Sequence, residues 1–402
     1  MDRQARFVLL NGIMYSIANT IASGFVNVFL IRVTDSIGPI IIQNILSAAT
    51  ILSAFVLGEK LMERVNILHL LRLGIGLTAS YYLIILLLQE RTAYFIIPLG
   101  IFNGLGTGFY FFCQNILIGR MVPENERGKF FGLQQSFGSF FGIVTPIISG
   151  FIIVQFTELT GYYILFIASI VIFVLGVGMT TQLKGFTFSR QQNALKALML
   201  KGNKYWSTDR VYNFTFGAST MIHGQIFILT AFYILNNEQL IGYHNALGAL
   251  MGLFSSLWLA KKLNKYNRHQ FHLTATLVFL TVLGALAFTM SPWALTLAFI
   301  GMGIVNGWNS AIYQTFKFEL ARLAQGEFSV DEFIVAAEFP MAAGRIIGLV
   351  VSLVVSSWLP LHLAYGVLLV VVALLVLFDH LLLRFSVNWL KAETAAADAV
   401  GN

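Results

Sequence analysis

Two charged side chains, Glu338 and Arg345, stand in a stretch dominated by Ile, Leu, Val, Ala and Gly, residues 334–357. In a helix with a rise of about 1.5 Å per residue, they share a face and lie about 10 Å apart. That separation is too large for a direct ion pair unless the helix bends at Pro340. A guanidinium in an apolar medium costs at least about 2.5–3.5 kcal/mol. We therefore expect Arg345 to bind a substrate anion or to tune the protonation of Glu338. Alternatively, the Arg345 guanidinium has only a structural role and donates hydrogen bonds to backbone carbonyls or to Asn309.

Further amides and imidazoles interrupt other apolar stretches. Such groups can bind a polar substrate, and histidines can titrate near neutral pH. The alternative for each amide is a hydrogen bond to a neighbouring helix, and for each histidine a neutral, packed ring. As a set, we expect them to line a substrate path with Arg345 and Glu338. These residues are Asn19, Asn103, Gln114, Gln135, His223, Gln225, His244, Asn306, Asn309 and Gln314.

The composition excludes a water-soluble enzyme and a nucleic-acid binder. Of the 402 residues, 57% are hydrophobic and only 11% charged, whereas soluble domains carry about 25% charged residues. The single cysteine, Cys113, excludes an intramolecular disulfide and a Cys-rich metal site. No nucleophile elbow, zinc-protease motif or Walker loop stands in a suitable context. We expect no enzymatic activity, no cofactor and no bound metal.

The apolar residues form runs long enough to cross a bilayer as helices, for which about 20 residues are needed. We expect an all-α polytopic membrane protein, because the runs are continuous rather than alternating. Twelve membrane-spanning helices are predicted. They cover residues 8–31, 37–58, 67–88, 93–117, 130–155, 160–181, 208–234, 238–260, 270–289, 293–318, 334–357 and 362–386.

The positive charges indicate an orientation rather than a polyanionic partner. Of the 25 Lys and Arg residues, only Arg32 and Arg91 fall on one side of the predicted spans, Arg345 falls within a span, and all others lie on the opposite side. The positive-inside rule then predicts that both termini are cytoplasmic. Short loops and the lack of an organellar presequence favour a bacterial plasma membrane.

The predicted spans divide into two halves. The longest loop separates an N-terminal bundle (1–181) from a C-terminal bundle (208–386), and a cytoplasmic tail follows (387–402). The linker, 182–207, carries an apolar stripe beside lysines, and we expect a short amphipathic helix on the membrane surface, with a regulatory docking site as the alternative. Similar residues recur in the two halves at a nearly constant spacing: Asn103-Gly104 corresponds to Asn306-Gly307, and Gln135 corresponds to Glu338, each pair 203 residues apart. This pattern predicts an internal duplication.

The arrangement resembles the major facilitator superfamily. The loop MVPENERGKFFGLQQSFG (121–138) is similar to the loop of that family into its fifth span, and residues 145–150 match an exporter motif in part. The resemblance implies two six-helix half-bundles around a central cavity, with the third, sixth, ninth and twelfth spans outside it. Those spans indeed have almost no polar residues in their middles. The resemblance also implies a cytoplasmic gate motif after the second and eighth spans, formed here by Gly58, Glu63, Arg64, Lys261, Lys262 and Lys265.

These features predict a secondary transporter that works by alternating access. We expect proton-coupled export of a small amphipathic compound by a functional monomer in the lipid bilayer. The alternatives are an importer of a polar solute, or a flippase that uses Arg345 to hold an anionic (glyco)lipid. A non-transporting membrane sensor or scaffold is a more remote alternative, because no soluble effector domain is visible.

Overall fold

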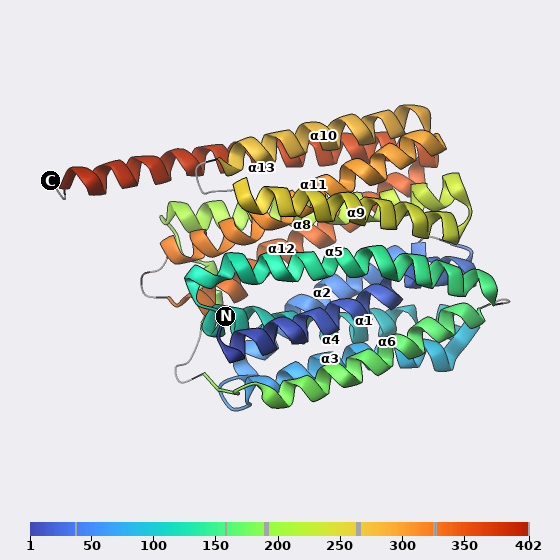
Figure 1. Ribbon diagram of the computed structural model, residues 1–402, viewed down its shortest axis with the longest axis horizontal. Helices are drawn as coiled ribbons and strands as arrows, with labels where there is room; N and C mark the ends of the chain where they lie inside the picture. The colour runs from blue at the N-terminus through green and yellow to red at the C-terminus, as the bar shows by residue number, and fades with distance from the viewer. Residues whose placement is uncertain are drawn as a thin grey trace.

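The computed structural model describes residues 1–36, 38–156, 159–188, 193–262, 267–324, 326 and 328–400 (Figure 1). Within these residues it consists of twelve long helices, one short helix and two 3-10 segments, Gln89–Phe95 and Thr180–Gln182. The helices are α1 (Arg3–Thr34), α2 (Gly38–Leu61), α3 (Ile67–Leu88), α4 (Ile96–Met121), α5 (Glu124–Gln155), α6 (Thr160–Met179), α7 (Ala194–Leu198), α8 (Lys204–Leu235), α9 (Glu238–Lys262), α10 (Arg268–Thr289), α11 (Pro292–Leu323), α12 (Val330–Trp358) and α13 (Leu361–Val400).

The long helices suit a bilayer. In the described part of the chain, ten stretches are long and apolar enough to span a membrane, and one of them, residues 67–121, contains both α3 and α4. The remaining long helix, α9, packs against α5 and α11. Large apolar side chains are exposed along the outer helices, for example Leu175 on α6 and Leu374 on α13. The predicted all-α membrane fold is therefore confirmed.

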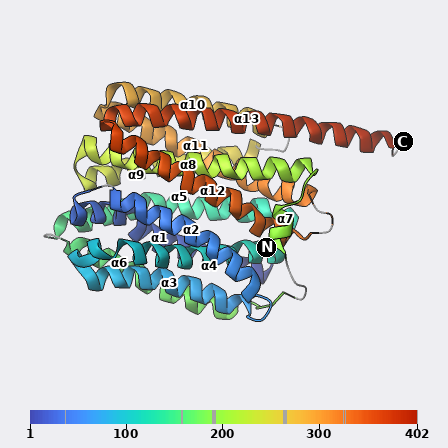
Figure 2. The same cartoon turned by 180° about the vertical axis from the view of Figure 1, so that it is seen from behind.

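The two halves repeat one packing scheme. In the first half, α1 packs against α5 and α6, α2 packs against α4, and α3 packs against α4 and α6. In the second half, the equivalent helices make the same contacts: α8 packs against α12 and α13, α9 packs against α11, and α10 packs against α11 and α13. Between the halves, α2 packs on α12 and α5 on α9, which are again equivalent pairs. Figures 1 and 2 show the halves side by side with both termini at the same end.

Backbone geometry carries the same repeat. Among the described residues, four that are not glycine have positive φ: Asp35 (50°) and Asn236 (42°), which end α1 and α8, and Gln89 (51°) and Met290 (46°), which follow α3 and α10. The members of each pair are 201 residues apart. Left-handed conformations are rare outside glycine, so their recurrence at equivalent helix ends supports the internal duplication.

Glycines let helices approach closely in both halves. A methyl group added to Gly104 of α4 would overlap Thr50 and Ser47 of α2, and one added to Gly307 of α11 would overlap Ser256 of α9. The Asn-Gly landmarks of the sequence thus mark equivalent helix crossings, of the kind that small residues permit in membranes.

The linker between the halves contains a short helix that packs against the protein. Helix α7 has only five residues and packs against α12, with Ala194 and Ala197 buried and Leu195 and Met199 exposed. The first N–H groups of a helix have no partner within it. Carboxylates of the bundle accept these hydrogen bonds, as described below, and they hold α7 in place. Beyond the bundle, α13 continues as a helix through the segment 387–400 (Figure 1).

The bundle is closed at one end and open at the other. We call the end that holds α7 and the N-terminus the basic end. There, Phe333, Ile334 and neighbouring residues of α12 belong to the same buried cluster as the core of the N-terminal half. At the opposite end, both halves line a cavity of about 610 Å³, the first with Ile31, Asp35 and Ser36 and the second with Leu229, Phe232, Tyr233 and Asn236. The structure is therefore open away from the basic end.

Candidate transport site

Glu338 and Arg345 form a direct ion pair in α12. The distance from Arg345 Nη1 to Glu338 Oε1 is 2.5 Å, and the side chains are 22% and 5% exposed, respectively. The expectation that they lie too far apart was wrong, because the long arginine side chain reaches back over two turns, past Met341 Sδ. The guanidinium is therefore neutralised by a carboxylate of its own helix.

Two further charged residues lie close to this pair. Asp209 of α8 and Lys317 of α11 are both buried. The ammonium of Lys317 interacts electrostatically with the carboxylates of Glu338 and Asp209, and its Nζ lies 5.9 Å from the centre of the Tyr313 ring. We call Asp209, Lys317, Glu338 and Arg345 the four-charge cluster. It contains two acids and two bases, so its formal charge is balanced.

Hydrogen bonds connect the helices that carry the four-charge cluster. The hydroxyl of Tyr313 on α11 donates to Asn213 Oδ1 on α8 over 2.7 Å, and Asn213 Nδ2 donates to the backbone carbonyl of Asp209 over 2.7 Å. The hydroxyl of Tyr313 also lies 4.0 Å from Met341 Sδ on α12. Tyr313 thus links α11 to both α8 and α12 beside the four-charge cluster.

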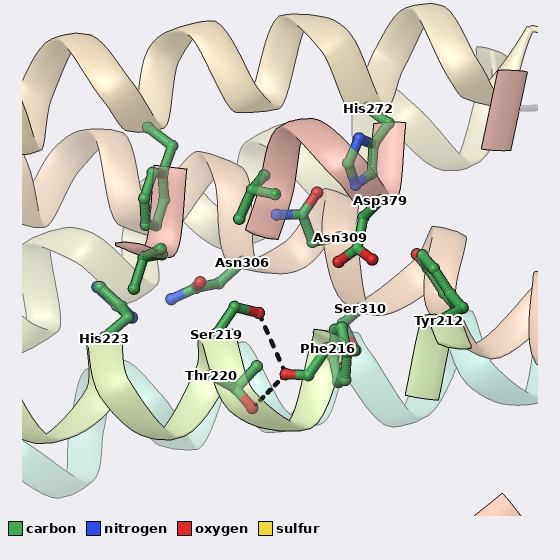
Figure 3. A pocket seen from close by; sticks show the side chains of 13 residues that line it. Tyr212, Phe216, Ser219, Thr220, His223, His272, Asn306, Asn309, Ser310 and Asp379 are labelled. Carbon is green, nitrogen blue, oxygen red and sulfur yellow. Dashed lines mark hydrogen bonds between the residues drawn. The ribbon is translucent and has the colours of Figure 1, made fainter. Parts of the chain in front are cut away.

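A separate pocket lies within the C-terminal half, between α8, α10, α11 and α13 (Figure 3). Its volume is about 110 Å³. Polar groups line it from all four helices, and it includes the predicted residues His223, Asn306 and Asn309 together with His272 and Asp379. His223 Nε2 and Asn309 Oδ1 have no hydrogen-bond partner in the described part of the chain.

Other predicted amides join helices of the N-terminal half. Asn19 accepts a hydrogen bond from Tyr82 over 3.2 Å, Asn103 donates to Ser47 over 3.2 Å, and buried Gln114 donates to the carbonyl of Val8 over 3.3 Å. These contacts match the structural alternative that the sequence left open.

The remaining predicted residues are not part of the four-charge cluster. His244 contacts the carbonyl of Leu240 (2.7 Å) and the hydroxyl of Thr296 (3.0 Å), both near the open end. Gln135 and Gln314 are half-buried. Gln225 lies on α8, but its side chain is outside the described residues.

The expected gate motif is mostly on the surface. Glu63 and Arg64 are exposed in the turn after α2, and Lys262 is exposed at the end of α9. Gly58 is buried where a methyl group would press against the Phe112 ring. The side chain of Lys261 and all of Lys265 lie outside the described residues.

Other residues hold the basic end closed. Arg120 of α4 forms a salt bridge of 2.9 Å with Asp331 of α12, which joins the two halves. Buried Glu59 of α2 accepts the N–H of Ala194 (2.8 Å), and buried Glu332 of α12 accepts the N–H of Asn193 (2.9 Å). The start of α7 thus bridges carboxylates from both halves.

The sequence reasoning missed several buried charges. Asp209 and Lys317 are each one residue inside the end of a predicted span (208–234 and 293–318) and were not predicted as site residues, although α8 and α11 extend past them by more than a turn. Asp379 and His272 belong to spans that were expected to face only lipid, yet both line the pocket. An acid next to an otherwise apolar run was the available signal for Asp379.

Two curated bacterial proteins are similar to this chain. "Uncharacterized protein YqgE" of Bacillus subtilis (strain 168) is 25% identical over 364 residues, which cover 88% of this chain and 83% of that protein. "Uncharacterized protein in sodM 3'region" of Geobacillus stearothermophilus is 26% identical over 168 residues, which cover 42% of this chain and 78% of that protein.

Solved structures share the fold over nearly the whole chain. A bacterial homologue of the iron transporter ferroportin in the outward-facing state is 15% identical with a TM-score of 0.70, and the match covers 95% of this chain and 99% of that one. The inward-facing state gives a TM-score of 0.62 at 16% identity, covering 96% and 98%. The transporter FucP in the outward conformation also gives 0.62 at 16% identity, covering 94% and 98%. Residues 8–328 match the family model for the Major Facilitator Superfamily, and the chain belongs to this superfamily of membrane transporters.

Proposed function

We propose that this protein is a proton-coupled exporter of a small amphipathic compound, acting by alternating access in a bacterial plasma membrane with its basic end in the cytoplasm. The family and the fold support a secondary transporter. The orientation follows from the positive charges at the basic end.

The observation that carries the coupling is the four-charge cluster. Glu338 holds Arg345 while it is ionised, and a proton on Glu338 removes the charge that attracts the guanidinium. The freed guanidinium and Lys317 then repel each other, and each needs another partner. Because the cluster joins α8, α11 and α12, protonation changes contacts between helices on which the second half depends.

The closed basic end supplies the other half of the mechanism. The salt bridge of Arg120 with Asp331 and the α7 bridge between Glu59 and Glu332 must break before this end opens. Their loss is offset by closure of the cavity between α1 and α8 at the opposite end. Rocking of the two half-bundles exchanges the two sets of contacts.

Binding of an anionic substrate by Arg345 has less support. Its guanidinium already contacts Glu338, and an anion would have to displace that carboxylate. The flippase alternative therefore needs an additional cation, whereas proton coupling uses the pair as it stands.

The test is transport in proteoliposomes with an imposed pH gradient and a panel of lipophilic cations, organic anions and sugars. We expect one class to drive proton movement in the wild type. Glu338→Gln, which cannot take up a proton, should lose gradient-driven transport at least tenfold while it retains substrate exchange. Glu90→Gln, an exposed glutamate at the opposite end, is the matched control and should behave as wild type. Unchanged proton coupling in Glu338→Gln would overturn the proposal.

A further inference from the structure

The pocket between α8, α10, α11 and α13 is distinct from both the opening between the halves and the four-charge cluster. It lies within one half-bundle, and its walls combine one carboxylate, two imidazoles, two amides and several aromatic rings. Figure 3 shows Asp379 and His272 on one side, with Tyr212 and Phe216 facing them from α8. The polar side chains distinguish this pocket from a packing defect lined only by apolar side chains.

Asp379 is the acidic group of this pocket. Its residue is 3% exposed, and one carboxylate oxygen, Oδ1, accepts a hydrogen bond from the hydroxyl of Thr215. In the described part of the chain, no Lys or Arg forms a salt bridge with Asp379, whereas Glu338, Asp331 and Glu319 each have such a partner. A buried carboxylate without a cation is costly, so a cation that enters the pocket gains a strong partner.

Aromatic rings form the walls around that carboxylate. Tyr212 and Phe216 line the pocket from α8 and Phe279 from α10. The Phe216 ring stacks on Tyr313 with centroids 3.9 Å apart, which fixes its orientation. Ring faces attract organic cations, and the attraction is larger where water is excluded.

Two side chains that line the pocket each have a buried polar atom without a hydrogen-bond partner in the described part of the chain. Asn309 Oδ1 is an acceptor without a partner in the described part of the chain, and His223 Nε2 is equally unpaired. Buried polar atoms normally have hydrogen-bond partners. The hydroxyls of Ser219 and Thr220 donate to the carbonyl of Phe216 within α8 (Figure 3), so only their oxygen lone pairs remain for a ligand.

The volume limits the ligand to a few non-hydrogen atoms. The pocket measures about 110 Å³, whereas an apolar cavity of about 150 Å³ holds benzene. Among the described residues, no group of three or more His, Cys, Asp and Glu side chains is arranged to hold a metal ion. We infer that this pocket binds a small primary alkylammonium ion, with its charge against Asp379 and its alkyl part between the rings of Phe216 and Phe279.

The inference that this pocket binds an alkylammonium ion does not rest on the proposed export function. Equilibrium binding in detergent, without any gradient, therefore separates the two. A failure of proton-coupled flux would leave a positive binding result standing, and the absence of binding would leave the coupling role of Glu338 standing.

The experiment is isothermal titration calorimetry of the purified full chain with propylammonium chloride. Controls are 1-butanol, a neutral molecule of similar size, and sodium chloride at the same ionic strength. We expect saturable binding of propylammonium only. The carboxylate variant Asp379→Asn should weaken it at least tenfold, whereas Glu90→Gln, at an exposed glutamate, should not.

A second variant keeps the test decisive if Asp379→Asn does not fold. Phe279→Leu retains the carboxylate and removes one ring, and we expect affinity to fall about three- to thirtyfold. Size-exclusion chromatography and a melting temperature near that of the wild type establish folding. Absence of saturable propylammonium binding, equal binding of 1-butanol, or unchanged affinity in the folded variants would overturn the inference.

Discussion

The contact between Glu338 and Arg345 is the residue-scale basis of the proposed mechanism. The carboxylate is almost fully buried, whereas the guanidinium is partly exposed. Burial makes the pair sensitive to the loss of either member, because the remaining charge has no equivalent partner on its own helix. An ion pair in this setting is better suited to switching than to stabilisation.

This view predicts a non-additive double-mutant cycle. Arg345→Met should lower the free energy of unfolding by about 3 kcal/mol because it removes the direct ion-pair partner of the buried Glu338 carboxylate. Glu338→Gln should also lower the free energy of unfolding, because it removes the carboxylate that pairs with the Arg345 guanidinium. The double variant should be more stable than the sum of the single effects predicts, since it leaves neither charge behind. Chemical unfolding in detergent provides the measurement, and strictly additive effects would show that the two side chains act independently.

At the scale of elements, close helix crossings hold each half together. Gly104 and Gly307 occupy equivalent positions in α4 and α11, where a side chain would overlap the partner helix. Because lipid tails are as apolar as leucine side chains, helix association in a membrane depends on such close packing. These glycines therefore matter for the fold rather than for substrate binding.

Gly104→Ala should accordingly destabilise the protein by about 1–3 kcal/mol, because the methyl group forces α2 and α4 apart. Gly76→Ala is the matched control: it lies in α3 with no atom within 4 Å of the added carbon. There the better helix propensity of alanine should leave stability unchanged or raise it by up to about 1 kcal/mol. Melting temperatures of the two variants decide the matter, and equal destabilisation by both would refute the role of the crossing.

The elements were largely predictable from the sequence because the length of an apolar run determines where a helix can span a bilayer. Residues 67–88 form α3 as predicted. Helix α5 begins at Glu124 rather than 130, since polar residues continue the helix beyond the membrane. The charged site was less predictable. Which face of α8 or α13 meets its neighbours depends on helix rotation, so the burial of Asp209 and Asp379 was not evident from composition.

The whole molecule combines a repeated half with an unsymmetrical site. Both halves share packing and cap geometry, yet Glu338 and Arg345 lie on α12, and the pocket with Asp379 lies entirely in the C-terminal half. The proposed division of labour follows: the N-terminal half provides a scaffold with internally bonded amides, and the C-terminal half carries the groups that respond to protons and ligands.

Orientation in the membrane gives a prediction at this scale. A fluorescent protein fused after residue 402 should fluoresce in bacterial cells, and alkaline phosphatase at the same site should be inactive, because the basic end is expected in the cytoplasm. Insertion of the same reporters after Glu90, at the opposite end, should give the reverse pattern. Active phosphatase at the C-terminus would contradict the orientation and hence the assignment of export.

Alternating access is the central claim, and paired distance measurements test it most directly. In a Cys113→Ser background, spin labels at Ser36 and Tyr233 report on the open end, and labels at Arg64 and Lys262 on the basic end; all four positions are exposed. On acidification the account predicts that the first distance shortens and the second lengthens, and that Glu338→Gln abolishes the response to pH. Distances that change in the same direction at both ends, or that respond to acid as fully in Glu338→Gln as in the wild type, would contradict it.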